Sequence, residues 1–305
     1  MSELRLGMIG LDTSHATAFT DLLNLEDNPN HVKGGKVAVA FPGGSQEFSL
    51  SRDRVEKITQ QLVEKHNIKL VDSVEAVAEE SDAIFLESVD GRQHLEQFSK
   101  IVSYKKPVFI DKPLACSVAD ARAIFQLAKE HGTPVFSCSA IRYGAGIADV
   151  EGDRKVLGCE SFGPMAILPD FPGLFWYGIH SAEVLFSKMG AGCVEVRTIR
   201  NETADVVVAK WNDGRMGTLY GYRIPKVGSF GATVLTDGGV FQSLALTSPP
   251  YYAKLLPKVI EFFNTGVSPV SYAEMLEITA FLEAATYSYE TGEVVQLSQY
   301  GDFNV

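Results

Sequence analysis

Two segments of the chain place residues that can transfer protons beside predicted structural boundaries. Asp111-Lys112-Pro113 directly follows an apolar run that ends at Ile110. In WYGIHSAE (176–183), His180 and Glu183 are three residues apart and would share one face of a helix. Histidine titrates near neutrality and can accept a hydroxyl proton, and lysine can hydrogen-bond a substrate hydroxyl or a ribose. The pattern favours acid–base chemistry with Glu183 orienting the ring; the alternatives are a solvated lysine and a structural histidine.

The segment Gly10-Leu11-Asp12-Thr13-Ser14-His15 lies between the first apolar run and the first predicted helix. A phosphate-binding loop occupies this position in dinucleotide-binding folds, because the helix N-terminus presents free N–H groups. The segment departs from G-x-G-x-x-G, since Asp12 and His15 replace the second and third glycines. The hydroxyls of Thr13 and Ser14 can partly offset the Asp12 carboxylate. The predicted cofactor contacts in this segment are Gly10, Asp12, Thr13, Ser14 and His15, with an ordinary strand–helix turn capped by Asp12 as the alternative.

The end of the second predicted strand lacks the acid that usually binds the ribose of NAD. It reads AFPGGS (40–45), and Arg52 and Arg54 follow shortly after. Ser45 and the two arginines could instead meet the 2′-phosphate of NADP, or both arginines could face solvent. The predicted cofactor is therefore NAD or NADP.

Composition excludes several classes of partner. The net charge of −11 and the absence of a basic run argue against nucleic-acid binding. No apolar run approaches the ~20 residues of a membrane helix, and the N-terminus shows no signal-peptide pattern. Scattered cysteines predict free thiols in a reducing compartment. The histidines lack close ligand spacing, so no metal site is predicted. We expect a soluble cytoplasmic protein.

The first 140 residues must supply the elements that position these motifs. Short apolar runs alternate with amphipathic stretches, and strands joined by single helices predict a doubly wound parallel sheet. The expected strands are 4–10, 36–41, 82–86, 107–110 and 134–137. Lys112 would then lie at the carboxyl end of a strand, where ligands bind in such sheets.

The rest of the chain has a different pattern. Strand-like runs with hairpin turns between 193 and 243 predict a mostly antiparallel sheet, with helices at about 177–189, 252–263 and 272–290. Residues 142–169 are expected to be irregular. The predicted domains are 1–125, a Rossmann domain, and 126–305, an α+β substrate-binding and oligomerisation domain. One face of an open sheet needs cover, so a homodimer or tetramer is expected, with 206–211 and 232–235 in the interface.

These motifs together resemble the glucose–fructose oxidoreductase/inositol dehydrogenase (Gfo/Idh/MocA) family. The similar segments are LRLGMIG (4–10), DAIFLESVDGRQH (82–94), KKPVFIDKPLACS (105–117) and GIHSAEVLFSKMG (178–190). The resemblance implies that Lys112 and His180 are the catalytic lysine and histidine, and that Ser88 and His94 lie among the cofactor contacts. Asp12, Val89 and Trp176 depart from the family pattern, which suggests a divergent subgroup.

The predicted function is that of an NAD(P)-dependent oxidoreductase acting on a hydroxyl of a sugar, polyol or related small molecule. Arg142, Trp176 and Tyr177 are candidate substrate contacts, and Arg142 could clamp a carboxylate. Two alternatives remain open at this point. One is a non-catalytic nucleotide- or sugar-binding relative, and the other is an NAD-assisted glycosidase-type enzyme, for which the aromatic segment 171–177 would stack on a sugar.

Overall fold

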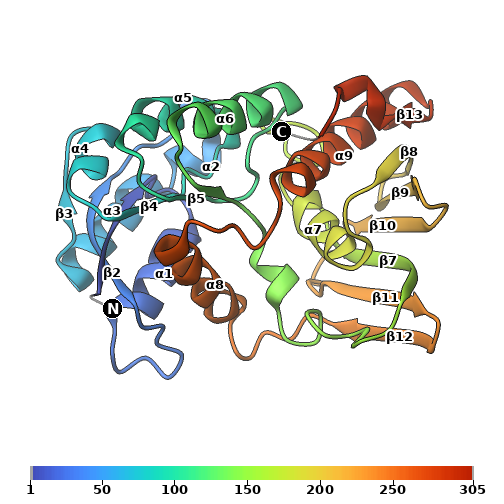
Figure 1. Cartoon of the computed structure of the whole chain (residues 1–305), viewed down its shortest axis with the longest axis horizontal. Helices are drawn as coiled ribbons and strands as arrows, with labels where there is room; N and C mark the ends of the chain where they lie inside the picture. The colour runs from blue at the N-terminus through green and yellow to red at the C-terminus, as the bar shows by residue number, and fades with distance from the viewer. Residues whose placement is uncertain (1–2, 304–305) are drawn as a thin grey trace. The chain divides into compact units, whose positions relative to one another are not determined.

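The computed structural model describes residues 3–303, which form two compact units (Figure 1). The first unit contains the chain up to Ala115, Ala119–Cys138 and Tyr252–Val270, and the second contains Cys116–Val118, Ser139–Tyr251 and the chain from Ser271. This partition differs from a single division at 125/126, because a helix near the C-terminus packs with the N-terminal unit.

The first unit is built on a six-stranded parallel sheet, so the predicted doubly wound fold is confirmed. Its strands, in chain order, are β1 (Leu4–Ile9), β2 (Gly35–Phe41), β3 (Lys69–Leu70), β4 (Ala83–Leu86), β5 (Val108–Ile110) and β6 (Val135–Phe136). Their order across the sheet is β3-β2-β1-β4-β5-β6. The sequence did not indicate β3, because it is only two residues long and both are exposed. The central strands are buried on both faces, as their continuous apolar runs require.

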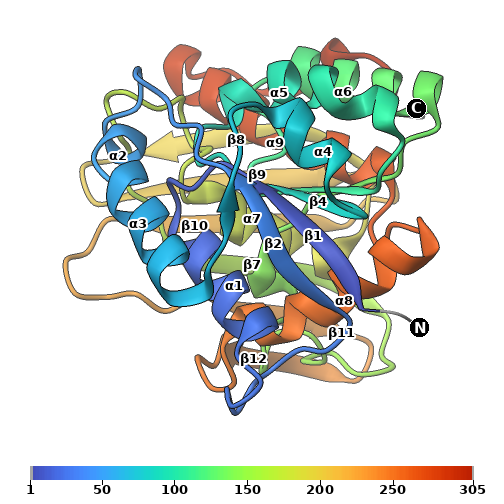
Figure 2. The ribbon, with the colours of Figure 1, turned by 90° about the vertical axis from the view of Figure 1, so that its left-hand side faces the viewer.

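Crossover helices cover the two faces of this sheet (Figures 1 and 2). One set consists of α1 (Ser14–Asn24), α2 (Ser49–Arg52) and α3 (Val55–His66), and the other consists of α4 (Val74–Glu79), α5 (His94–Ile101) and α6 (Val118–His131). Local sequence sets several helix ends. Ser73 accepts a hydrogen bond from the Ala76 N–H, as expected for an N-cap, and Thr13 caps α1 in the same way through the His15 N–H.

Helix α8 (Tyr251–Thr265) belongs to the first unit although it lies late in the sequence. Its Phe262 and Phe263 rings lie 5.6 Å from Phe136 and 5.1 Å from Phe85, respectively. Both partners lie on strands in the β4–β6 half of the sheet, on the face opposite α4, α5 and α6. On that same face, right-handed crossovers place α1 and α3 over the β1–β3 half of the sheet. Helix α8 therefore supplies the apolar cover for the β4–β6 half.

The second unit contains a seven-stranded mixed sheet, mostly antiparallel as predicted. The strands are β7 (Val156–Pro164), β8 (Cys193–Arg200), β9 (Ala204–Trp211), β10 (Met216–Tyr222), β11 (Gly231–Thr236), β12 (Gly239–Leu244) and β13 (Val295–Gln296), in the order β12-β11-β7-β10-β9-β8-β13. Helices α7 (Gly178–Met189) and α9 (Tyr272–Thr291) pack on one face. Strand β7 corrects the prediction that 142–169 is wholly irregular, and it pairs in parallel with β10.

No helix within residues 3–303 is long and apolar enough to cross a membrane.

Candidate functional site

The loops that follow β1, β4 and β5 meet at the carboxyl edge of the first sheet. The strand order reverses between β1 and β4, and ligands bind at this position in doubly wound sheets. Gly10 has a φ of +89°, and a Cβ at this residue would lie 2.3 Å from the Ser88 backbone nitrogen. A side chain here would force the β1 and β4 loops apart, so the first glycine of the predicted loop is required by close backbone approach.

Asp12 has a structural role that differs from the predicted cofactor contact. Its side chain is fully buried, and its carboxylate accepts hydrogen bonds from the Ser51 hydroxyl (2.5 Å) and the Val89 N–H (3.0 Å). Burial raises the pKa of Asp12, against the opposing effect of these hydrogen bonds. The carboxylate that replaces the second glycine therefore ties two loops together inside the unit.

His94 and Ser45 are also engaged within the protein. The His94 ring is fully buried, with Nδ1 3.0 Å from the Leu114 carbonyl oxygen and Nε2 2.8 Å from that of Ser88. The Ser45 hydroxyl donates to Asp90, which also pairs with Arg92. Both side chains hold loops in place, in contrast to the direct cofactor contacts predicted for them.

Other predicted cofactor residues remain suitably placed. Ser14 begins α1 and is exposed, so the helix N-terminus has a polar, accessible first residue. The Ser88 hydroxyl oxygen is buried and has no hydrogen-bond partner among residues 3–303. A buried hydroxyl without a protein partner is uncommon, and this one is free to hydrogen-bond a bound molecule.

Lys112 lies directly after β5 among buried acids. It is 5% exposed, and it interacts electrostatically with Glu87 and Asp111. The His15 Nδ1 lies 2.7 Å from Asp111 Oδ2. Burial raises the pKa of Asp111, but the charge and hydrogen bond of His15, with Lys112, outweigh it and leave this pKa below its ordinary value.

Glu87 was not among the predicted site residues. It follows β4 and is fully buried, and burial, reinforced by the charge of Asp111, raises its pKa well above the ordinary value. An acid directly after the apolar strand 82–86 was the available sequence signal. Its importance depends on neighbours that come from other strands.

In the second unit, His180 is held by a residue that the sequence did not indicate. The Ser139 Oγ lies 2.7 Å from His180 Nδ1, and the ring packs edge-on against Tyr177 and Phe230. Glu183 was expected to orient this ring. It contacts Arg142 instead, with its Oε2 2.8 Å from Arg142 Nε, and it accepts the Ser139 backbone N–H. Ser139 therefore connects the histidine to the buried ion pair.

Arg142, which was predicted to clamp a substrate carboxylate, is engaged by two carboxylates of the protein itself. It is 8% exposed and pairs with Glu183 and with Glu274, whose Oε1 is 2.5 Å from Arg142 Nη2. Burial raises the pKa of Glu183 to about 7, against the opposing charge of Arg142. Trp176 is buried against Phe171, whereas Tyr177 is half-buried beside His180. Of the three predicted substrate contacts, Tyr177 is the one that is both partly exposed and next to His180.

Replacement of Arg142 by methionine should destabilise the protein by about 3–5 kcal/mol, because the buried Glu183 and the partly buried Glu274 lose their counter-ion. Urea unfolding at pH 7.5 measures this change. Lys100→Met is the matched control, because Lys100 forms an exposed i,i+4 pair with Glu96 and its loss should cost less than about 1 kcal/mol. Equal stabilities for the two variants would contradict the positioning role of Arg142.

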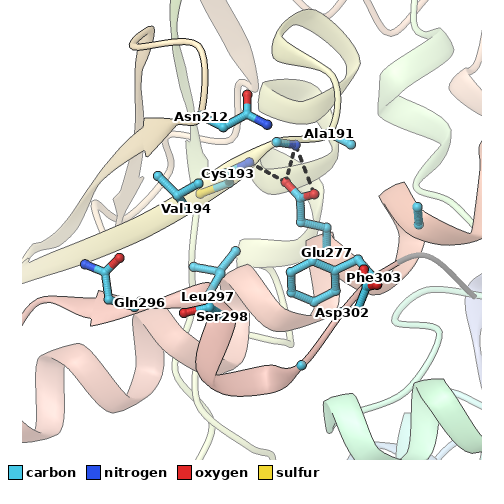
Figure 3. A pocket seen from close by; sticks show the side chains of 13 residues that line it. Ala191, Cys193, Val194, Asn212, Glu277, Gln296, Leu297, Ser298, Asp302 and Phe303 are labelled. Atoms are coloured by element: carbon cyan, nitrogen blue, oxygen red, sulfur yellow. Dashed lines mark hydrogen bonds between the residues drawn. The ribbon is translucent and has the colours of Figure 1, made fainter.

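A hollow of about 520 Å³ lies in the second unit between the start of β8, α9 and the segment after β13 (Figure 3). Glu277 of α9 points toward the first residues of β8, and its carboxylate accepts the backbone N–H groups of Gly192 and Cys193. Burial raises the pKa of Glu277 to about 7, although both N–H groups oppose the shift. This carboxylate fixes the beginning of β8 on α9.

The raised pKa of Glu277 predicts that it contributes less stability as pH rises. Between the ordinary glutamate pKa of 4.5 and about 7, the folded state binds more protons at this site than the unfolded state, so the free energy of unfolding falls across this window. Relative to Glu277→Gln, the wild type should lose about 2–3 kcal/mol between pH 5 and pH 7.5. Urea titrations at the two pH values test this, and parallel pH dependence would refute it.

The strand order and the loops at its reversal define a dinucleotide-binding domain of the Rossmann type. Residues 5–138 match the Gfo/Idh/MocA model described as "Oxidoreductase family, NAD-binding Rossmann fold". The protein is accordingly an NAD(P)-dependent oxidoreductase. The chain has no significant match among curated proteins.

Solved structures share the fold over nearly the whole chain. GenD2 from gentamicin A biosynthesis, solved with NAD, has a TM-score of 0.79 at 14% identity, covering 97% of each chain. Myo-inositol dehydrogenase from Lactobacillus casei, solved with NAD(H) and myo-inositol, has a TM-score of 0.75 at 15% identity, also with 97% coverage of each. The apo scyllo-inositol dehydrogenase from the same organism gives 0.75 at 13%, covering 97% of this chain and 99% of its own.

The residues at the sheet edge fit a nicotinamide dinucleotide. The Gly10 approach to Ser88, the unpartnered Ser88 hydroxyl and the exposed start of α1 suit a pyrophosphate. A hollow of about 350 Å³ at the end of β2 includes Phe41, Gly43 and Gly44 in its lining and suits the adenosine end. When bound, the cofactor would supply hydride transfer.

Proposed function

We propose that this protein is a dehydrogenase that oxidises a hydroxyl of a sugar, polyol or related small molecule, with Lys112 and His180 as its catalytic pair. The observation that carries the proposal is the setting of Lys112. It is a nearly buried ammonium at the carboxyl end of β5, beside Glu87 and Asp111, on an NAD-binding domain. Such a lysine can donate a hydrogen bond to the substrate oxygen and polarise it.

His180 supports the same reaction from α7. Its Nδ1 is engaged by Ser139, so we assign proton transfer with the substrate hydroxyl to Nε2. Arg142 and Glu183 hold the Ser139 segment in place, and Tyr177 offers an aromatic face and a hydroxyl next to the histidine. The relatives solved as inositol dehydrogenases favour a polyhydroxylated substrate.

The charges near the end of β2 favour NAD over NADP. The hollow there is lined by Asp72, Glu75 and Glu96, and its Lys100 pairs with Glu96. Arg52 donates to the Gln46 carbonyl and approaches Asp53. This negative charge would repel a 2′-phosphate, although the usual ribose-binding acid is missing from β2.

Thermal unfolding with NAD, NADH, NADP and NADPH, followed by a panel of polyols and sugars, tests the proposal. We expect a clear rise in melting temperature with NAD or NADH, a smaller rise with the NADP pair, and NADH formation with at least one polyol. Cofactor binding without turnover on any substrate would favour the non-catalytic alternative. Release of sugar from an aryl glycoside without net NADH formation would favour the glycosidase-type alternative.

We also propose that the open face of the second sheet joins copies of this chain. The register places Ile199, Val206, Tyr220, Phe162 and Leu244 in one row across β8, β9, β10, β7 and β12. A second row contains Lys210, Met216, Leu235 and Val240. The exposed fractions of Ile199 and Val240 reach 62% and 67%. The row between them is mostly polar, with Arg197, Val208, Thr218, Glu160, Thr233 and Gln242. A face with two exposed rows rich in apolar side chains is normally covered, and a homodimer or tetramer would cover it in a cytoplasmic enzyme.

The variant Tyr220→Lys should dissociate this oligomer. Tyr220 lies opposite Phe162 and Val206 near the centre of the face and is 39% exposed, so a lysine there leaves the fold intact but opposes burial. Light scattering after size exclusion should give a multiple of 33.2 kDa for the wild type and 33.2 kDa for the variant. Lys129→Glu, a charge reversal on α6, should leave the mass unchanged. A monomeric wild type would contradict the proposal.

A further inference from the structure

Three side chains with metal-ligand atoms meet at the edge of the first sheet. His15 begins α1 after β1, Glu87 follows β4, and Asp111 follows β5; these three strands are neighbours. One ligand atom from each residue lies within 4.8 Å of those of the other two. All three residues are buried, at 9%, 0% and 2% exposure. They lie far apart in the sequence, so the absence of close histidine spacing says nothing about this cluster.

Glu87 is the member that points to a missing ligand. Both of its carboxylate oxygens are buried and have no hydrogen-bond partner among the described residues. Removing an ionised carboxylate from water without a partner is strongly unfavourable, so buried carboxylates are normally paired, hydrogen-bonded or bound to a metal. His15 and Asp111 already contact one another, with 2.7 Å between Nδ1 and Oδ2, and they do not satisfy Glu87.

Potential negative charges outnumber the lysine charge around the cluster. Glu87 interacts with the carboxylates of Asp111 and Asp12 and with the ammonium of Lys112, which gives three potential negative charges against one positive charge. Asp12 faces Ser51 and Val89 and lies near His94, and Asp111 faces His15. A divalent cation bound among these carboxylates would add the positive charge that Lys112 alone does not supply.

We propose that His15, Glu87 and Asp111 bind a divalent first-row transition metal ion such as Mn²⁺ or Zn²⁺. One imidazole and two carboxylates form a mixed nitrogen and oxygen donor set that suits these ions better than Ca²⁺ or Cu⁺. Three protein ligands leave a coordination position for water or a substrate oxygen. The ion takes the place of the proton on His15 Nδ1; that proton moves to Nε2 of a neutral ring, or leaves an imidazolium for solvent. The His15 and Asp111 donor atoms then separate to about 3 Å or more, as bonds of about 2.1 Å to one ion require.

Metal titration of the full-length protein, stripped with a chelator, tests the proposal without any measurement of activity. Nucleotide is omitted, because a pyrophosphate binds divalent ions by itself. We expect one Mn²⁺ per chain by electron paramagnetic resonance, and competition by Zn²⁺ for the same site. Glu87→Gln keeps the side-chain shape and removes a ligand charge, so it should weaken Mn²⁺ binding by at least about 100-fold. Loss of a residue that only hydrogen-bonds to a metal ligand typically weakens metal binding by about 10- to 100-fold. His15→Gln, at a more exposed position, should have a similar effect.

Glu277→Gln is the matched control, because it removes a buried carboxylate of the second unit outside the cluster. It should bind Mn²⁺ like the wild type. No stoichiometric binding of either ion, or undiminished binding by both Glu87→Gln and His15→Gln, would overturn the metal site. In that case Glu87 is a protonated acid. The melting shift with NAD or NADH is measured separately, so failure of the metal site can be distinguished from failure of the proposed function.

Discussion

Lys112→Met is expected to lower kcat, for a sugar or polyol that the wild type oxidises, by about 10³-fold while preserving the melting shift with NAD or NADH. The lysine is nearly buried at the end of β5, where its ammonium acts in a medium of low polarity. Loss of a preorganised donor to a reacting oxygen typically costs 10²- to 10³-fold, and this lysine also carries a full charge. Methionine has a similar length and apolar stem, so it removes the ammonium and leaves little cavity.

Steady-state kinetics and thermal unfolding on the same preparations separate the two effects of this change. Methionine also leaves Glu87 and Asp111 without their neighbouring cation, so the variant is expected to melt at a lower temperature than the wild type. Lys112→Arg keeps the charge but changes the donor geometry, and it should retain intermediate turnover. Full turnover by Lys112→Met would remove the catalytic role of this residue, even if cofactor binding were confirmed.

His180→Gln is expected to reduce kcat by about 10³-fold, within the range for loss of a general acid or base. Glutamine keeps a polar side chain of similar length but cannot exchange a proton near neutral pH. The wild type should lose kcat/KM for alcohol oxidation toward acid pH, as the imidazole becomes protonated. This acid limb should be absent from the profile of the variant, a change that a structural histidine would not produce.

Two further variants test how His180 is positioned. Ser139→Ala removes the contact with Nδ1 and should lower kcat by about 10-fold, with the acid limb retained but displaced. His66→Gln alters a histidine that contacts Asp21, and should leave turnover unchanged. An unaltered pH profile in His180→Gln would exclude the histidine as the base, whatever the fall in rate.

Much of the fold could be predicted because local pattern and tertiary structure agree. The central strands of the first unit are continuous apolar runs that end in glycine, proline or an acid, and their burial on both faces leaves no other arrangement for them. Strands β3 and β7 lacked such a signal. Two exposed residues form β3, and β7 combines glycines with alternating buried cysteine and serine, so both are defined by pairing with neighbours.

Side-chain roles were harder to predict than side-chain positions. The sequence placed Asp12, His94 and Ser45 beside the cofactor region, but each turns into the protein because a hydrogen-bonding group from another loop is within reach. Arg142 was expected to meet substrate, and two acids from α7 and α9 engage it instead. These partners are 20 to 132 residues apart in the sequence, roughly 70 to 450 Å of fully extended chain, so no local pattern can identify them.

The sequence by itself determined the alternation of strands and helices, because the spacing of apolar residues marks each element. It also determined the parallel sheet and the location of Lys112 at a strand end, because single helices between strands make the strands run in the same direction. It also placed His180 on a helix, where spacing is regular. Only the tertiary structure decided that α8 returns to cover the first sheet, that Ser139 holds the histidine, and that His15, Glu87 and Asp111 converge. Side chains from separate strand ends meet only when the sheet forms, because hydrogen bonding between strands sets which ends are neighbours.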